Sequence, residues 1–241
     1  MKEYLSKNAA VYNLTDRKKH IIIPALRRHI KKVRSGSLLD LACGNALFYP
    51  LIAQKGYKYF GLDISPVLLE QARKRFSKGH YLLGDARKFA KMYKDQKFDV
   101  ILSNLLLPAL SKKQDIIKVF RESKKVLKPN GRMIFVVINP IFDMYMYKGL
   151  FGKKGIKAQY KGYFNSGAKF IFTRQFPKGK FEFTDYHWTL TDYFDAMKKT
   201  NLSVVELDEC PPNKNLQKDN PGLYKKYQTY PSYMILVCES I

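Results

Sequence analysis

The stretch SLLDLACGNALF at residues 37–48, read together with GLDIS at residues 61–65, decides the fold of this chain. An apolar run at 38–41 ends in a turn of small residues, an amphipathic segment follows, and a second apolar run ends at Asp63. This order predicts a strand, a tight turn, a helix and a second strand. Small turn residues let the backbone approach a ligand, and a carboxylate at the tip of the second strand can accept both ribose hydroxyls. The unit therefore favours a ligand that contains a nucleoside.

Two common phosphate-binding patterns are absent from this turn. A dinucleotide fingerprint needs Gly-x-Gly-x-x-Gly, whereas the turn contains only Gly44. A phosphate-cradling loop that ends in Gly-Lys-Ser/Thr is absent as well. The predicted ligand therefore carries a nucleoside without a pyrophosphate.

Five segments in series resemble the motifs of the seven-stranded, class I S-adenosylmethionine-dependent methyltransferases, and among them the small-molecule type. The segments are DLACGNA at 40–46, GLDIS at 61–65, GDARKF at 84–89, FDVILSN at 98–104 and LKPNGRMIFVV at 127–137. One such motif arises by chance, but five in this order are specific. The resemblance implies a doubly wound α/β fold with a seven-stranded, mostly parallel sheet, a last strand that runs antiparallel, and S-adenosylmethionine as the cofactor.

The resemblance also implies which residues hold the cofactor. The turn residues Ala42, Cys43 and Gly44 would approach its methionine part, Asp40 would orient that turn, and Asp63 would accept from the ribose. In addition, the resemblance assigns to the cofactor site the residues Ile64, Asp85, Ala86, Ser103 and Tyr12. Among these, Ile64 would pack on the adenine, Asp85 and Ala86 would bind its polar edge, and Tyr12 would be a lid residue.

Two alanines depart from the family's pattern, which has glycine at the positions of Ala42 and Ala46. An alanine at position 42 costs little conformational free energy if its φ is negative. The methyl group of Ala46 lies where the family's backbone passes close to the methionine part of the cofactor. A non-catalytic cofactor-binding partner subunit is therefore kept as one alternative.

The acceptor site is expected around Asn104 and Leu105, after the fourth strand. The Asn/Asp-Pro-Pro-Tyr/Phe clamp of nucleic-acid amino-methyltransferases is absent there, and the apolar residues 105–108 favour a small-molecule acceptor. Residues 184–207 resemble a segment of small-molecule methyltransferases. There His187 would be either the general base for a hydroxyl acceptor or part of the pocket lining. The other candidates for substrate binding are Tyr163, Tyr186 and Trp188.

The chain is 241 residues long, which fits one methyltransferase domain over 1–241. We distinguish a basic helical segment at 1–36 and an insertion at 140–188, whose alternating runs predict a β-hairpin over the acceptor site. Helices are predicted near 46–55, 66–77, 111–127 and 190–200. Strands are predicted near 37–42, 58–63, 80–83, 98–102, 132–138, 202–207 and 232–238.

The net charge of +24 leaves two interpretations open. A basic surface favours an anionic partner, so an RNA methyltransferase, directed at tRNA, is a second alternative. Only ten of the 44 basic residues are arginine, however, and the lysines are dispersed, which favours a compositional bias without a partner. The sequence leaves the oligomeric state open.

The remaining composition gives the expected location. The sequence has no apolar stretch of about 18 residues and no signal peptide, which predicts a cytoplasmic protein without a transmembrane segment. The three cysteines have spacings that predict neither a metal site nor a disulfide framework.

Overall fold

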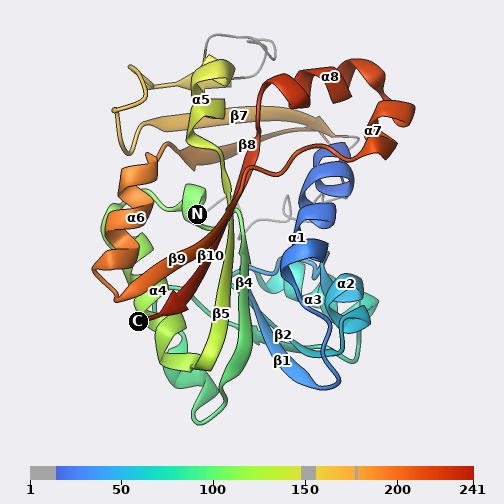
Figure 1. Cartoon of the computed structure of the whole chain (residues 1–241), viewed down its shortest axis with the longest axis vertical. Helices are drawn as coiled ribbons and strands as arrows, with labels where there is room; N and C mark the ends of the chain where they lie inside the picture. The colour runs from blue at the N-terminus through green and yellow to red at the C-terminus, as the bar shows by residue number, and fades with distance from the viewer. Residues whose placement is uncertain (1–14, 148–155, 177–178) are drawn as a thin grey trace.

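The computed structural model describes residues 15–147, 156–176 and 179–241, and most of them form an α/β fold (Figure 1). Its main sheet has seven strands in the order β3-β2-β1-β4-β5-β10-β9, and helices lie against both faces. The strands are β1 (Gly36–Leu41), β2 (Tyr57–Asp63), β3 (His80–Leu83), β4 (Phe98–Asn104), β5 (Leu127–Ile138), β9 (Leu202–Asp208) and β10 (Tyr233–Ser240). The helices around them are α1 (Ile23–His29), α2 (Tyr49–Gln54), α3 (Pro66–Arg75), α4 (Lys113–Val126), α6 (Leu190–Lys198), α7 (Lys214–Asp219) and α8 (Pro221–Thr229).

The strand directions confirm the predicted doubly wound topology. Strands β1 to β5 pair in parallel, and β10 runs antiparallel to β5 and β9. The strand order reverses between β1 and β4, where Leu41 is in register with Ser103. In open sheets of this kind, ligands bind outside the carboxyl ends of the strands at such a reversal.

Alternate residues of the strands pack into two hydrophobic cores, one on each face of the sheet. Leu38 and Tyr59 face α1, α2, α3, α7 and α8, whereas Leu39 and Leu41 face α4 and α6. Strands that are buried on both faces read as nearly continuous apolar runs, which explains why β1 and β4 were recognisable in the sequence.

Local signals set several element boundaries. The Ser65 hydroxyl accepts from the Leu68 N–H at 3.4 Å and starts α3. Thr189 and Asp192 form a capping box at the start of α6. In the turn at 128–131 the positive φ, +61°, belongs to Asn130.

The insertion between β5 and α6 contains a second, three-stranded sheet. Its elements are α5 (Pro140–Tyr147), β6 (Ile156–Ala158), β7 (Lys169–Phe176) and β8 (Gly179–Tyr186). Strands β7 and β8 form the predicted antiparallel hairpin, in which Phe172 pairs with Phe183. Helix α5 begins two residues after β5 ends, so the insertion starts at the carboxyl edge of the main sheet (Figure 1).

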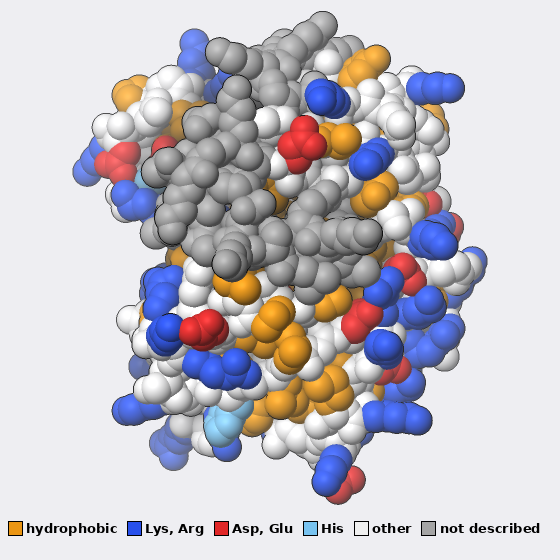
Figure 2. Space-filling model, turned by 180° about the vertical axis from the view of Figure 1, so that it is seen from behind, with side chains coloured by type: hydrophobic (Ala, Val, Ile, Leu, Met, Phe, Trp, Pro, Cys, Tyr) orange, Lys and Arg blue, Asp and Glu red, His pale blue; other side chains and the backbone are white. Residues whose placement is uncertain are grey.

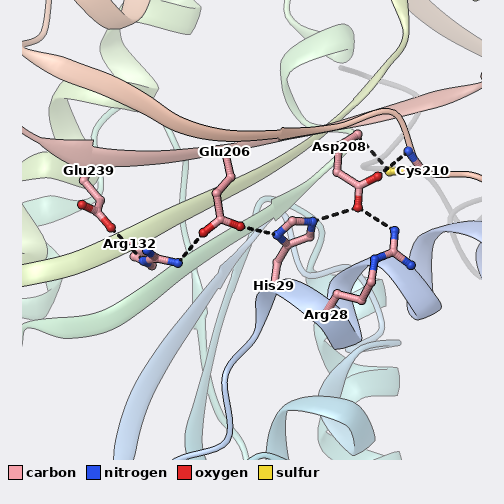
Figure 3. Close-up of polar contacts among 7 residues, drawn as sticks. All are labelled: Arg28, His29, Arg132, Glu206, Asp208, Cys210 and Glu239. Atoms are coloured by element: carbon pink, nitrogen blue, oxygen red, sulfur yellow. Dashed lines mark hydrogen bonds and ion pairs between the residues drawn. The ribbon is translucent and has the colours of Figure 1, made fainter.

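The N-terminal helix is anchored to the C-terminal third of the chain. A π-helical turn, η3 (Lys18–Ile22), continues into α1, and its apolar side chains are fully buried. Figure 3 shows His29 between Glu206 and Asp208, at 3.1 and 2.9 Å. The His20 ring contacts Asn213 at 3.0 Å.

These contacts join residues that lie nearly 180 or more positions apart in the sequence. The basic N-terminal segment does not turn all its basic residues to solvent, since Lys18 is only 9% exposed. Among the described residues, no helix is both long enough and apolar enough to cross a membrane.

Candidate active site

A cavity of about 900 Å³, including the open solvent at its mouth, lies at the carboxyl ends of β1, β2 and β4. It is lined by Lys18, Asp40, Ala42, Cys43, Gly44, Asn45, Leu47, Phe48, Asp63, Ile64, Leu68, Asn104, Leu105, Leu106, Ala109 and Leu110. Eight residues predicted from the sequence are among them: Asp40, Ala42, Cys43, Gly44, Asp63, Ile64, Asn104 and Leu105. The cavity is thus where the topology predicts a ligand.

Asp63 fastens the turn after β1 to the end of β2. Its Oδ2 accepts from the Gly44 N–H at 2.7 Å, and its Oδ1 accepts from the Ser65 N–H at 2.8 Å. Burial raises the pKa of Asp63, and the hydrogen bonds from Ser65 and Gly44 oppose that rise. The carboxylate is therefore fixed in place at the edge of the cavity before any ligand arrives.

Asp40 lies deeper, at the end of β1. It is 1% exposed, and its Oδ2 accepts from the Tyr59 hydroxyl at 2.7 Å. Burial raises the pKa of Asp40 to about 7, with a lowering contribution from the Tyr59 hydrogen bond and a raising one from Asp63. Asp40 therefore changes charge near neutral pH, unlike an ordinary aspartate.

Three residues of the cavity loops adopt the left-handed conformation without being glycine. Ala42, Ala46 and Leu105 have φ values of +57°, +58° and +60°. The condition under which Ala42 would cost little, a negative φ, is therefore not met. An L-residue in this region costs about 1 kcal/mol or more, so both loops store backbone strain at the cavity.

Cys43 is held as a packed thiol. It is 7% exposed, and burial raises its pKa well above the ordinary value, so the sulfur stays protonated. Gly61 on β2 lies directly beneath it: a Cβ there would come within 2.7 Å of the Cys43 Sγ. The close approach fixes the height of the turn above the sheet.

The far side of the cavity is apolar. Leu105, Leu106, Ala109 and Leu110 form it, with Asn104 as a polar residue among them. The Asn104 Oδ1 and the Ser103 Oγ are buried and find no hydrogen-bond partner among the described residues. Ser103, which was predicted to contact the cofactor, is not among the described lining residues.

Trp188 supports this apolar wall from behind. Its indole N–H donates to the Leu110 carbonyl at 3.1 Å, and the ring is 5% exposed. The Tyr163 hydroxyl accepts from the Leu190 N–H at 3.3 Å, and Tyr186 packs against the same core as Trp188. The structure thus places none of these three predicted substrate contacts in the lining of the cavity.

His187 is fully buried, and both of its ring nitrogens are occupied. Nδ1 contacts the Asp143 carboxyl at 2.7 Å, and Nε2 lies 2.7 Å from the Tyr163 carbonyl oxygen. Asp143 is itself 6% exposed, and burial raises its pKa. A general base must present a nitrogen to its substrate. This geometry therefore argues against the predicted role of His187 as a base and gives it a structural one.

Asp85 lies beyond the cavity lining, in the loop after β3. Its carboxylate is bound by the guanidinium of Arg87, with an Nη2–Oδ2 distance of 2.7 Å. Ala86, next in the chain, packs against the core formed with α4 and α6. Tyr12, the predicted lid residue, lies outside the described residues.

Lys18 is the charged lining residue that sequence reasoning missed. It lies in η3, upstream of the first motif, and reaches the cavity because the N-terminal helix packs across the sheet. No local pattern distinguishes it from the other lysines of that helix. The cavity lining thus includes an ammonium group as well as the two aspartates.

Comparison with known proteins agrees with this geometry. A methyltransferase domain family matches residues 39–135. A ubiquinone biosynthesis O-methyltransferase from Pelagibacter ubique is 27% identical over 184 residues, which cover 76% of this chain and 68% of the relative. A malonyl-[acyl-carrier protein] O-methyltransferase from Serratia marcescens is 32% identical over 98 residues, 41% of this chain and 36% of the relative. An S-adenosylmethionine-dependent methyltransferase structure from Mesorhizobium loti superposes with a TM-score of 0.65 at 20% identity, over 89% of this chain and 95% of that one.

Residues 39–135 match a methyltransferase domain, and the chain has the class I fold of the S-adenosylmethionine-dependent methyltransferases. Its sheet order, its antiparallel last strand and the matched domain agree on this class. It is therefore an enzyme whose cofactor is S-adenosylmethionine.

Proposed function

We propose that this enzyme transfers the methyl group of S-adenosylmethionine to an oxygen atom of a small, largely apolar acceptor. The composition of the cavity lining carries the proposal: it combines the charged residues Lys18, Asp40 and Asp63 with leucines at 105, 106 and 110. The charged residues suit the zwitterionic methionine end and the ribose of the cofactor. The apolar residues suit an acceptor with few polar groups.

The strand order supports a direction for the bound cofactor. The methionine part would lie over the turn after β1, with its carboxylate toward Lys18 and its amino group toward Asp40. Asp63 at the end of β2 would accept from the ribose. The base would then lie toward β3, the next strand in the sheet, where Asp85 and Ala86 follow.

The residues present fit this cofactor in charge and in shape. Bound S-adenosylmethionine supplies the electrophilic methyl carbon and its own leaving group. The protein then positions the acceptor for in-line attack and excludes water from the site. The apolar wall of the cavity would keep the water out. We assign Asn104 to orienting the acceptor, because its amide is the polar group in that part of the cavity lining.

The insertion 140–188 is proposed to act as the cap of the acceptor site, within a single domain that spans 1–241. The Trp188–Leu110 hydrogen bond supports this, since it connects the segment that follows β8 to the apolar wall. A location in the cytoplasm remains part of the proposal.

The names of the relatives favour oxygen as the methylated atom, since one is a ubiquinone biosynthesis O-methyltransferase and another a malonyl-[acyl-carrier protein] O-methyltransferase. They give the RNA alternative no support. On the face in Figure 2, Lys and Arg side chains are dispersed around a hydrophobic band rather than gathered in one patch. The non-catalytic alternative is not favoured, because these relatives are methyltransferases by name.

Turnover with defined acceptor classes tests the proposal. The enzyme is incubated with S-adenosylmethionine and panels of phenols, carboxylic acids and amines, and S-adenosylhomocysteine is quantified. Methylation of phenols or carboxylic acids is expected. A phenol must lose its proton, so its rate would rise with pH, whereas a carboxylate needs no base. Turnover with amines alone contradicts transfer to oxygen, and cofactor binding without any turnover favours the non-catalytic alternative.

A further inference from the structure

A second cavity lies where α1, α2 and α3 gather on one face of the sheet (Figure 1). It measures about 1100 Å³, including the open solvent at its mouth. We call it the helix groove, and its lining is Ile23, Arg27, Leu47, Phe48, Pro50, Leu51, Gln54 and Arg75. Leu47 and Phe48 also line the first cavity, so the two cavities adjoin.

The helix groove combines apolar surface with positive charge. Five of its lining residues are apolar, Arg27 and Arg75 are basic, and no described lining residue is acidic. Phe48 and Leu51 are buried, so this part of the lining is built from side chains that are fixed in the core. Both arginines are exposed. A lining of this kind matches a ligand that carries an alkyl chain and a small anionic head group.

Arg27 and Arg75 are held in place without a carboxylate partner in the part of the chain that the structure describes. The Arg27 Nη1 donates to the Gln54 Oε1 at 3.1 Å, and this acceptor is neutral. The Arg75 guanidinium lies over the ring of Phe76, 5.2 Å from its centroid. Phe76 is itself stacked on Tyr49, with the ring centroids 4.7 Å apart. The two positive charges are thus positioned, and no described carboxylate compensates them.

We propose that the helix groove is a second ligand site, which binds a long-chain carboxylate such as a fatty acid. Arg27 and Arg75 would bind the carboxylate, because the planar fork of a guanidinium matches its two oxygens. The alkyl chain would lie on Phe48, Pro50 and Leu51, where its burial is favourable. Small-molecule sites commonly measure about 300–1000 Å³, so the groove has room for such a chain.

The shape of the groove favours one chain from solution over a membrane surface. A groove is concave and takes up a single chain, whereas a protein that binds a bilayer inserts protruding apolar side chains. The site is also distinct from the proposed acceptor site, because neither Arg27 nor Arg75 lines the first cavity. The proposal therefore stands apart from the proposed function and can be tested without S-adenosylmethionine.

Calorimetric titrations with three amphiphiles test the site. The wild type should bind decanoate. It should bind hexanoate at least about tenfold more weakly, because four fewer methylene groups are buried. It should bind decylammonium at least about tenfold more weakly, because a cation would meet the two arginines. A wild type that does not bind decanoate overturns the proposal, as does one that binds decylammonium equally well. Binding to phosphatidylglycerol vesicles without binding to decanoate would overturn it in favour of a membrane surface.

Substitutions in the groove locate the carboxylate. Arg27→Gln and Arg75→Gln should each weaken decanoate binding severalfold, and the double variant about tenfold. Gln54→Glu should also weaken it severalfold, because the new carboxylate would pair with Arg27 and compete with the ligand. That variant keeps the shape of the side chain and its contact with Arg27, so its effect is separate from misfolding.

Arg121→Gln is the matched control. Arg121 is exposed on α4, which packs against the opposite face of the sheet, and its substitution removes one charge of the +24 without changing the groove. Decanoate affinity should stay the same. An equal loss in Arg121→Gln and Arg27→Gln would show a general attraction to a basic protein and would overturn the site.

Lys18→Gln distinguishes the groove from the first cavity, which has apolar surface and an ammonium group of its own. Decanoate affinity should be unchanged in this variant. A loss in Lys18→Gln together with full affinity in the double arginine variant would place the chain in the first cavity and overturn the proposal. Thermal unfolding of every variant identifies any loss of binding that comes from misfolding.

Discussion

Tyr59 donates a hydrogen bond of 2.7 Å to Asp40, and both side chains are at most 2% exposed. The carboxyl is thus buried next to one neutral donor, with the carboxylate of Asp63 nearby as a second unfavourable influence. A buried acid in this position has a pKa of about 7, so its charge is decided within the physiological pH range.

Cofactor affinity should therefore increase as the pH rises from 6 to 8. Asp40 is protonated below its pKa and ionised above it, and the ionised form attracts the cationic methionine end of S-adenosylmethionine. Calorimetric titrations at three pH values measure the slope. Asp40→Asn removes the titrating group and should remove most of the pH dependence of cofactor affinity. Any pH dependence that remains in this variant comes from the titration of the cofactor itself, so the difference between the two proteins is the contribution of Asp40. A slope of the same size in both proteins contradicts the assignment.

Glycine at position 42 or 46 should stabilise the protein. Ala42→Gly and Ala46→Gly each relieve left-handed backbone strain of about 1–2 kcal/mol in the folded state. Glycine also gives the unfolded chain more conformational entropy, which opposes this gain by about 0.4–1 kcal/mol. The free energy of unfolding is therefore expected to rise by about 0.5 kcal/mol. Urea unfolding measures it. Ala53→Gly is the control, since Ala53 is exposed in the helix α2 and glycine there should destabilise by up to about 1 kcal/mol. Equal destabilisation at all three positions would show that the turn carries no strain.

Removal of Asp63 should weaken cofactor binding strongly. Asp63→Ala deletes the proposed ribose acceptor and the anchor of the Gly44 N–H, and each hydrogen bond to a charged group contributes about 1.5–3 kcal/mol. A loss of at least about tenfold in affinity for S-adenosylmethionine and S-adenosylhomocysteine is expected by calorimetry.

Asp99→Ala is the matched control for Asp63. Asp99 pairs with Lys128 near the amino end of β4, at the opposite edge of the sheet. The Asp99→Ala variant should retain its affinity for S-adenosylmethionine and S-adenosylhomocysteine even if it loses stability. Wild-type protein that binds neither compound would falsify the cofactor site.

The contribution of His29 to stability should disappear at high pH. The hydrogen bond to Asp208, with help from Glu206, raises the pKa of His29. A histidine with a raised folded-state pKa stabilises the protein fully below its unfolded pKa of about 6.5, and this contribution is lost as the pH rises through the folded pKa. His29→Gln should therefore cost about 1 kcal/mol at pH 6 and less at pH 9. Chemical unfolding at both values tests this, and a cost that grows with pH has the wrong sign.

Trp188→Phe should affect the acceptor and spare the cofactor. The substitution keeps an aromatic ring but removes the N–H that binds the Leu110 carbonyl, leaving a buried acceptor unpaired at a cost of about 1 kcal/mol. We expect KM for the acceptor to rise severalfold while the Kd of S-adenosylmethionine stays the same. A parallel loss of both would indicate a general loss of folding.

The cofactor turn and the strand order could be predicted because their determinants are close together in sequence. Turn, helix and second strand lie within 37–65, and burial on both faces makes β1 and β4 apolar throughout. The capping residues Ser65 and Thr189 act within three residues of their partners, so their helix starts were also readable. The start of α8 at Asn220-Pro221 carries a similar signal, a capping asparagine before proline, and could have been found.

The rest of the site depends on contacts between distant segments. Lys18 reaches the cavity through the packing of a helix whose partners follow almost 200 positions later. His187 carried the residue type of a base, but its nitrogens are taken by residues 24 and 44 positions earlier. The positive φ of Ala42 follows from how the turn meets β2. The glycine that the family's pattern has at this position was the one indication of a positive φ in the sequence.

The π-helical turn that carries Lys18 is held by the last third of the chain: the Asn213 N–H donates to the His20 carbonyl, and Lys19 pairs with Asp219. In translation that helix emerges before the strands of the main sheet, and its partners follow almost 200 residues later. The strands of the cofactor turn can therefore assemble on the ribosome, while the wall bearing Lys18 closes only after residue 219 has been released. A nascent or C-terminally truncated chain would have the motif of the enzyme without its finished binding site.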